Sequence, residues 1–179
     1  MNRAEKARVK ARVERTKWSP NKMNQSQISP PITKNKGGTH VCAYLILRQK
    51  NDALLLLRKN TGYCDGQYGL VSGHVEDGEP ATVGMLREAK EEAGIELLPS
   101  QLKVVHVSHR YSNRQNVDIF FECTSWEGDI KNQEPEKCAA LEFFPLANLP
   151  DNTIPYIART LQAAANGICY SEDGWNLSP

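Results

Sequence analysis

The chain has 179 residues, with 22 Lys and Arg against 21 Asp and Glu, so its formal net charge is +1. Its five cysteines show no CxxC pair or zinc-ligand spacing, and the sequence shows no signal segment or membrane-length apolar run. These features argue against a disulfide scaffold, a zinc domain and a membrane protein. They predict one cytoplasmic domain with a modest core.

Positive charge is concentrated at the N-terminus. Residues 1–36 contain ten basic residues against Glu5 and Glu14, so the remainder of the chain is net acidic. We expect residues 1–36 to form a basic, flexible arm and residues 37–179 to form the domain, because the arm is mostly polar and lacks a buried stripe. Such an arm could bind nucleic acid, although a solvated arm is the more common case. Met23 is an alternative start, in which case residues 1–22 would not belong to the native protein.

The domain begins with strand patterns. Apolar runs at residues 40–47 and 53–57 flank a polar turn and predict a β-hairpin. Further strands are expected at residues 68–71, 102–109, 117–123 and 141–144. Helical spacing predicts helices at residues 80–93 and 154–165, with Gly94 ending the first and Gly167 following the second. Two helices against a mixed sheet give the α/β class.

The helix predicted at residues 80–93 has an acidic face. Its expected buried stripe consists of Thr82, Met85, Leu86, Ala89 and Ala93. Glu88, Glu91 and Glu92 fall together on another face and repel one another, whereas Arg87 and Lys90 point largely elsewhere. A divalent cation would neutralise them, and carboxylate ligands without Cys or His suit Mg²⁺ or Mn²⁺.

Gly84 lies in the interior of the same helix, where glycine costs roughly 1 kcal/mol relative to alanine. It precedes Glu88 by one turn. We expect the missing side chain to leave room beside the carboxylates for something to approach.

Residues 73–95 resemble the Nudix box, GX5EX7REUXEEXGU, where U is a bulky apolar residue. The positions in register are Gly73, Glu79, Arg87, Glu88, Glu91, Glu92, Gly94 and Ile95. Ala89 is smaller than usual at its U position. The resemblance is to MutT-type Nudix hydrolases. It implies the Nudix α/β/α sandwich with a mixed sheet, and Mg²⁺-dependent hydrolysis of a nucleoside triphosphate, favouring purines, to a nucleoside monophosphate and pyrophosphate.

The resemblance also implies roles for the box residues. Glu88, Glu91 and Glu92 would hold Mg²⁺ or Mn²⁺, and the Gly73 carbonyl is expected to be a further ligand because a turn without a side chain can approach a cation closely. Either Glu88 or Glu91 would take the proton of the attacking water. Arg87 would orient a box glutamate, and Glu79 would brace the loop against the helix. A further acidic ligand is open between three candidates, Glu122, Glu134 and Glu136.

Substrate contacts are expected from three residues. Arg58 ends a predicted strand just before the box and could bind phosphate, while Phe144 and Tyr156 could stack on a base. Other nucleoside diphosphate derivatives remain alternatives. Tyr111 favours a dinucleoside polyphosphate, and ADP-ribose is a further possibility. A non-catalytic nucleotide-sensing or RNA-associated module with this fold is the third alternative, although none of the box carboxylates is missing.

Overall fold

A computed structural model describes residues 38–175, which all lie within one compact unit. The predicted basic arm, residues 1–36, lies outside the described residues, as does the proposed start at Met23. The strands are β1 (His40–Gln49), β2 (Asp52–Arg58), β3 (Tyr68–Gly69), β4 (Val71–His74), β5 (Lys103–Tyr111), β6 (Gln115–Cys123), β7 (Cys138–Pro145) and β8 (Tyr170–Asp173). The helices are α2 (Ala81–Ala93) and α3 (Pro155–Ala165), with a 3₁₀ turn at Pro99–Gln101.

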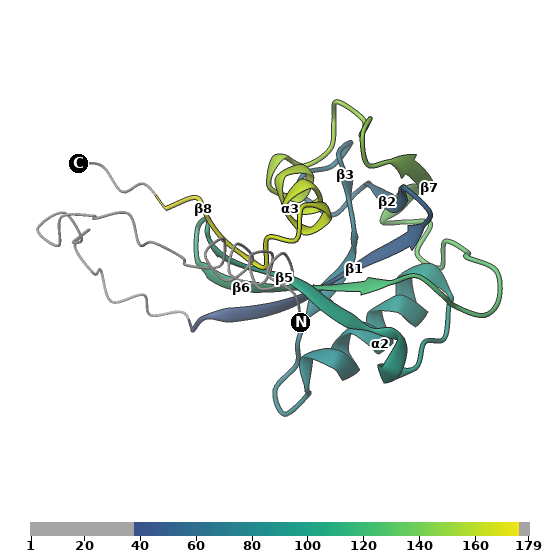
Figure 1. Ribbon diagram of the computed structural model, residues 1–179, viewed down its shortest axis with the longest axis horizontal. Coiled ribbons are helices and arrows are strands. Elements are labelled where there is room, and N and C mark those ends of the chain that lie inside the picture. The colour runs from purple at the N-terminus through teal and green to yellow at the C-terminus, as the bar shows by residue number, and fades with distance from the viewer. Residues whose placement is uncertain (1–37, 176–179) are drawn as a thin grey trace, which may run out of the picture. The chain divides into compact units, whose positions relative to one another are not determined.

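The strands form a mixed sheet in the order β3-β2-β1-β6-β5-β8, with β4 pairing β1 and β7 pairing β2. β1 runs parallel to β6, and β5 runs parallel to β8, whereas the other pairs are antiparallel. Figure 1 shows α2 on one face of this sheet and α3 on the other. The predicted α/β/α sandwich is therefore confirmed.

β1 places apolar side chains on both faces of the sheet, because side chains alternate along a strand. Ala43, Leu45 and Leu47 belong to one buried cluster, to which α2 contributes Met85, Ala89 and Ala93. Cys42, Tyr44 and Ile46 belong to a second cluster, to which α3 contributes Ile157 and Leu161. The continuous apolar run in the sequence is thus explained by a central strand that is covered twice.

Most predicted elements are confirmed, with two differences in the strands. The strand expected at residues 68–71 is divided at Leu70, so that β3 pairs β2 while β4 pairs β1. β8 was not predicted, because its four residues carry no strong apolar alternation. Gly94 ends α2 in the left-handed conformation, with φ 69°, as glycine at this position predicts. No helix within residues 38–175 is both long and apolar enough to cross a membrane.

The predicted buried stripe of α2 is partly wrong. Met85, Ala89 and Ala93 are buried, but Thr82 and Leu86 are half-buried. Gly84 is buried as well, because it faces the loop that precedes the helix rather than solvent.

His106 fastens β8 to the sheet. Its ring is fully buried, with Nδ1 2.8 Å from the Ile168 carbonyl oxygen and Nε2 2.8 Å from the Ser171 hydroxyl.

We expect His106→Leu to lower the free energy of unfolding by about 1–3 kcal/mol, because both partners lose a hydrogen bond. Urea denaturation measures this change. Val104→Thr, at a half-exposed position of the same strand, should leave stability nearly unchanged; an equal loss in both variants would contradict the role of the ring.

Candidate active site

A cavity of about 910 Å³ opens among β1, β4, β5, α2 and α3. Residues from both halves of the sandwich line it, so it receives side chains from the helix on each face of the sheet. Acidic side chains come from α2, the loop before it and the segment before β7, and we call them the acidic cluster: Glu76, Glu88, Glu91, Glu92 and Glu134. Cationic side chains on its lining are Arg58, Arg87, Arg110, Arg114 and Lys137.

Gly73 allows β4 and α2 to approach closely. A Cβ atom at this position would overlap with the carboxylate of Glu88. Any side chain at Gly73 would therefore push the Glu88 carboxylate away from the strand. The glycine that opens the box is thus needed for packing of the strand against a carboxylate.

Arg87 joins three box glutamates, which corrects the expectation that it points elsewhere. Its Nε and Nη2 donate to the Glu79 carboxylate, each at 3.1 Å, and its Nη1 donates to Glu88 at 2.7 Å and Glu91 at 3.2 Å. Nη2 also donates to the carbonyl oxygen of His74 at 3.1 Å. One guanidinium group therefore connects β4, the loop before α2 and the helix itself.

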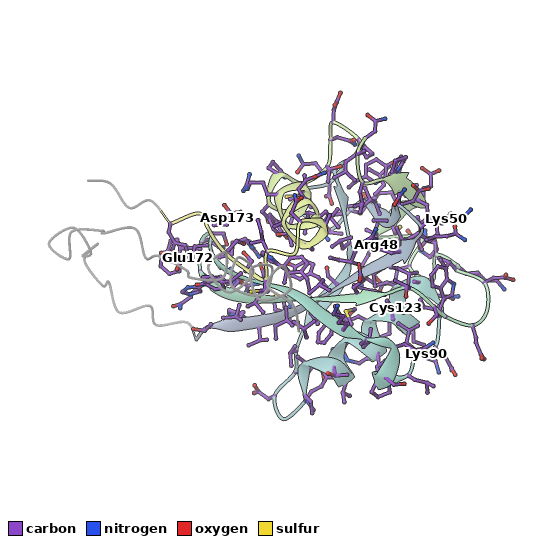
Figure 2. All side chains as sticks on the ribbon, in the orientation of Figure 1. Arg48, Lys50, Lys90, Cys123, Glu172 and Asp173 are labelled. Carbon is purple, nitrogen blue, oxygen red and sulfur yellow. The ribbon has the colours of Figure 1, made fainter. Side chains whose placement is uncertain are left out.

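Lys90 behaves as expected. It projects from the outer side of α2 (Figure 2), where its Nζ lies 2.7 Å from a carboxylate oxygen of Glu96 in a solvent-exposed ion pair. Such exposed pairs contribute little to stability. Lys90 therefore leaves the charge of the box glutamates unchanged.

Gly84 serves a different purpose from the one expected. A Cβ atom there would lie 2.9 Å from Oε2 of Glu79 and 3.7 Å from a methyl carbon of Val75. The room beside Gly84 is thus occupied by Glu79, whose Oε2 also accepts the Glu76 backbone N–H at 3.0 Å. The glycine makes space for the loop, and the expectation of an approach path to the carboxylates is wrong.

Glu92 is held differently from the glutamates that contact Arg87. Its Oε2 accepts the backbone N–H of Ser72 at 2.9 Å. Burial raises the pKa of Glu92 to about 8, and the charges of Glu88 and Glu134 add to this increase. The pKa of Glu88 is also raised, chiefly by burial, although Arg87 opposes the increase and Glu91 and Glu134 support it. Burial thus disfavours the ionised form of both carboxylates, and a single guanidinium, that of Arg87, is shared by three glutamates.

The donor set suits a hard divalent cation, because several carboxylates meet with no Cys or His side chain among them. Within residues 38–175, however, no three acidic, His or Cys side chains are arranged as a finished metal site. Glu88 and Glu91 are bonded to Arg87 and Glu92 is turned to Ser72, which accounts for this. The chemistry of the residues fits a metal ion, and binding would require these carboxylates to reorient.

The three candidates for a further acidic ligand are now separated. Glu134 lines the cavity, and its Oε1 lies 2.7 Å from Nζ of Lys137. Glu122 instead pairs with Arg48 at 3.0 Å, on residues that do not line the cavity. Glu136 does not line the cavity either. The geometry therefore favours Glu134.

The expected substrate residues divide as well. Arg58 lines the cavity and is held by the loop that follows β2, with its Nε 2.8 Å from the Tyr63 carbonyl oxygen and its Nη2 3.1 Å from Thr61 Oγ1. Tyr156 also lines the cavity. Phe144 does not, since its ring packs edge-on against Tyr68 in the second core cluster, so a base-stacking role for Phe144 is not retained.

Sequence reasoning missed an ion pair beside the cavity. Arg110 on β5 donates from Nε to Oδ2 of Asp118 on β6 at 2.6 Å, and both side chains are almost fully buried. Its guanidinium carbon lies 4.3 Å from the centre of the Tyr156 ring, whose hydroxyl is 3.2 Å from that of Tyr44. The signal was present, because Arg110 and Asp118 are charged residues at inward positions of alternating strands.

Comparisons with known proteins agree with this geometry. Residues 38–164 match the family model described as the NUDIX domain. The chain is 30% identical over 122 residues to a Caenorhabditis elegans protein named as a nudix hydrolase, covering 64% of this chain and 31% of that protein. It is 36% identical over 106 residues to the ADP-ribose pyrophosphatase of Methanocaldococcus jannaschii, covering 59% of this chain and 61% of that protein. These first two relatives are thus matched over less than two thirds of their length.

Two further similarities are to a curated relative and to a solved structure. The 8-oxo-dGTP diphosphatase of Proteus vulgaris is 26% identical over 100 residues, which is 56% of this chain and 88% of that protein. The crystal structure of a MutT NUDIX hydrolase from Burkholderia pseudomallei superimposes with a TM-score of 0.65 at 24% identity, covering 70% of this chain and 98% of that one. The chain, with three of its box glutamates on the lining of one cavity, belongs to the Nudix hydrolase family.

Proposed function

We propose that this protein hydrolyses a nucleoside triphosphate, favouring a purine base, to a nucleoside monophosphate and pyrophosphate in a reaction that depends on Mg²⁺ or Mn²⁺. One observation carries the proposal: a group of glutamates shares one cavity with several cations and with an aromatic wall formed by Tyr44 and Tyr156. The glutamates and cations suit a metal-bound polyphosphate chain, and the aromatic side chains suit a base. The relative from Proteus vulgaris, named an 8-oxo-dGTP diphosphatase, supports the same substrate class.

In this proposal Glu88, Glu91 and Glu92 hold the metal, with the Gly73 carbonyl as a further ligand and Glu134 within reach. The bound ion would neutralise phosphate charge and help to generate the nucleophile from water. Arg58 and Lys137, which also line the cavity, bind phosphate oxygens.

Hydrolysis proceeds in one displacement. The water oxygen bonds to the α- or the β-phosphorus while the bond from that phosphorus to the oxygen bridging the two breaks. Pyrophosphate leaves with the bridging oxygen after attack at the α-phosphorus, and the nucleoside monophosphate leaves with it after attack at the β-phosphorus. The carboxylate of Glu91 or Glu88 accepts the proton of the water. Arg87 holds both of these carboxylates by hydrogen bonds, and Glu79 fixes Arg87 in turn. Glu79 and Arg87 are thus positioning residues in this mechanism.

A second candidate substrate is ADP-ribose, which the relative from Methanocaldococcus jannaschii favours by its name. The two substrates give different products. A nucleoside triphosphate would yield a nucleoside monophosphate and pyrophosphate, whereas ADP-ribose would yield AMP and ribose 5-phosphate. Chromatography of the products from a panel of nucleotides with Mg²⁺ tests the proposal. We expect fastest turnover with purine triphosphates, and turnover of ADP-ribose alone would overturn it.

Glu91→Gln tests the acidic cluster. The change removes a negative charge with almost no change in volume at a half-exposed side chain. We expect the melting temperature to be maintained and turnover with Mg²⁺ to fall by roughly 10²–10⁴-fold, the range attributed to a lost general base. Glu96→Gln makes the same change at an exposed glutamate beyond α2 and should retain full activity. Activity of Glu91→Gln within a few-fold of the wild type would exclude Glu91 from the reaction.

Gly84→Ala tests the positioning residues. The new methyl group would displace the Glu79 carboxylate and so disturb its bonds to Arg87. We expect kcat to fall by about tenfold, equivalent to about 1.4 kcal/mol in the barrier. The melting temperature should change by less than about 4 °C, because the gain in helix propensity offsets the displaced carboxylate.

Val83→Ala is the matched control, since Val83 is the adjacent, half-exposed residue of the same helix turn. Its kcat should remain at the wild-type value. An unchanged kcat for Gly84→Ala would instead show that the contact of Glu79 with Arg87 has no part in turnover.

A further inference from the structure

Arg110 is an unusual residue for a strand interior. It is 8% exposed and lies beside Asp118 of the neighbouring strand β6, which is completely buried. Burying a charge is unfavourable unless the charge is paired, so Asp118 accounts for the presence of the guanidinium at this depth. The pair nevertheless uses just one of the three guanidinium nitrogens, because Asp118 contacts Nε.

The two terminal nitrogens of Arg110 are available to a ligand. Within residues 38–175 neither nitrogen makes a hydrogen bond to the protein. Neither nitrogen is fully shielded from solvent. Arg110 is also on the lining of the cavity. The donors Nη1 and Nη2 therefore meet the space where a substrate would bind.

The orientation of the guanidinium is fixed before any ligand arrives. Asp118 holds Nε at 2.6 Å, and the guanidinium carbon lies over the Tyr156 ring, 4.3 Å from its centre. Tyr156 is itself positioned by the Tyr44 hydroxyl at 3.2 Å. A group held on two sides loses little freedom when it binds a ligand, which favours a specific contact.

The charge balance indicates what kind of ligand fits. Asp118 already neutralises Arg110, so the pair has no net charge to attract a phosphate. The acidic cluster and the cations Arg58 and Lys137 form another part of the same cavity, and these can take the phosphate chain. A neutral group with two adjacent acceptors suits Arg110 better, and the O6 and N7 atoms of a 6-oxopurine are such a pair.

We propose that Arg110 is a specificity-determining residue that binds the O6 and N7 edge of a 6-oxopurine base, guanine or hypoxanthine. Adenine presents N7 together with an amino group at position 6, so an arginine donor would face a donor. A purine nucleotide without an oxygen at position 6 therefore forms one hydrogen bond fewer with Arg110, and we expect it to bind more weakly. This inference rests on the proposed function, because it names the base of the proposed nucleotide.

The wild-type protein provides the first test. Inosine triphosphate and purine riboside triphosphate differ at position 6, where the second has hydrogen in place of oxygen. We expect kcat/KM to be about tenfold or more higher for inosine triphosphate, with the difference mainly in KM, which is the size of discrimination expected for a bidentate contact. Equal values for the two substrates would overturn the proposal.

Arg110→Lys provides the second test. Lysine retains the charge beside Asp118 but lacks the planar pair of donors, so the ratio of kcat/KM for the two substrates should fall toward one. Arg114→Lys is the matched control, since Arg114 also lines the cavity but donates to Nε2 of His74 at 2.8 Å. Its ratio should equal that of the wild type. If Arg110 bound phosphate, both substrates would lose efficiency equally and the ratio would not change, which contradicts the inference.

Binding separates this inference from the proposed function. Dissociation constants of inosine monophosphate and purine riboside monophosphate can be measured by NMR titration without turnover. Selective binding of inosine monophosphate without triphosphate hydrolysis would overturn the proposed function and support the role of Arg110. Triphosphate hydrolysis with equal binding of the two monophosphates would overturn the role of Arg110 and leave the proposed function standing.

Discussion

The Arg87 guanidinium is the contact on which the acidic part of the cavity depends. Its bonds to Glu79, Glu88 and Glu91 and to the His74 carbonyl connect three successive segments of the chain. Bonds from an ionised donor to carboxylates are stronger than neutral ones, and a planar group fixes direction as well as distance. Without it, neighbouring carboxylates on α2 would repel one another and the loop before the helix would lose its main attachment. Gly73 and Gly84 make the arrangement possible by leaving room for the carboxylates of Glu88 and Glu79.

Most of the fold could be predicted from the sequence because local patterns and tertiary packing agree. The hairpin of β1 and β2, helix α2 and its end at Gly94 all follow from apolar periodicity and glycine placement. The break at Leu70 could not be predicted, since it depends on β3 and β4 choosing different partners. β8 was missed for a similar reason: its place at the sheet edge depends on pairing with β5, which is distant in the chain.

The site was predictable where its residues are close together in sequence. Spacing on one helix placed Glu88, Glu91 and Glu92 on one face, and the match to the box named their neighbours. The direction predicted for the Arg87 side chain was wrong, because helical angles alone do not show how far a long side chain can bend toward an acidic partner. Arg110 was missed, although strand alternation places it on the inward face of β5, because its partner Asp118 lies on the neighbouring strand and the local sequence does not show that pairing.

The two parts of the cavity differ in how far apart their residues lie along the chain. Most of the acidic cluster comes from α2 and the loop before it, between Glu76 and Glu92, with Glu134 added later. The aromatic wall instead joins Tyr44 of β1 to Tyr156 of α3, near the two ends of the described fold. Contacts of long sequence separation form late, and a chain emerges from the ribosome N-terminus first. We therefore expect a nascent chain to form the acidic cluster first. The guanidinium of Arg110 would then lack its contact with Tyr156 until α3 has been synthesised.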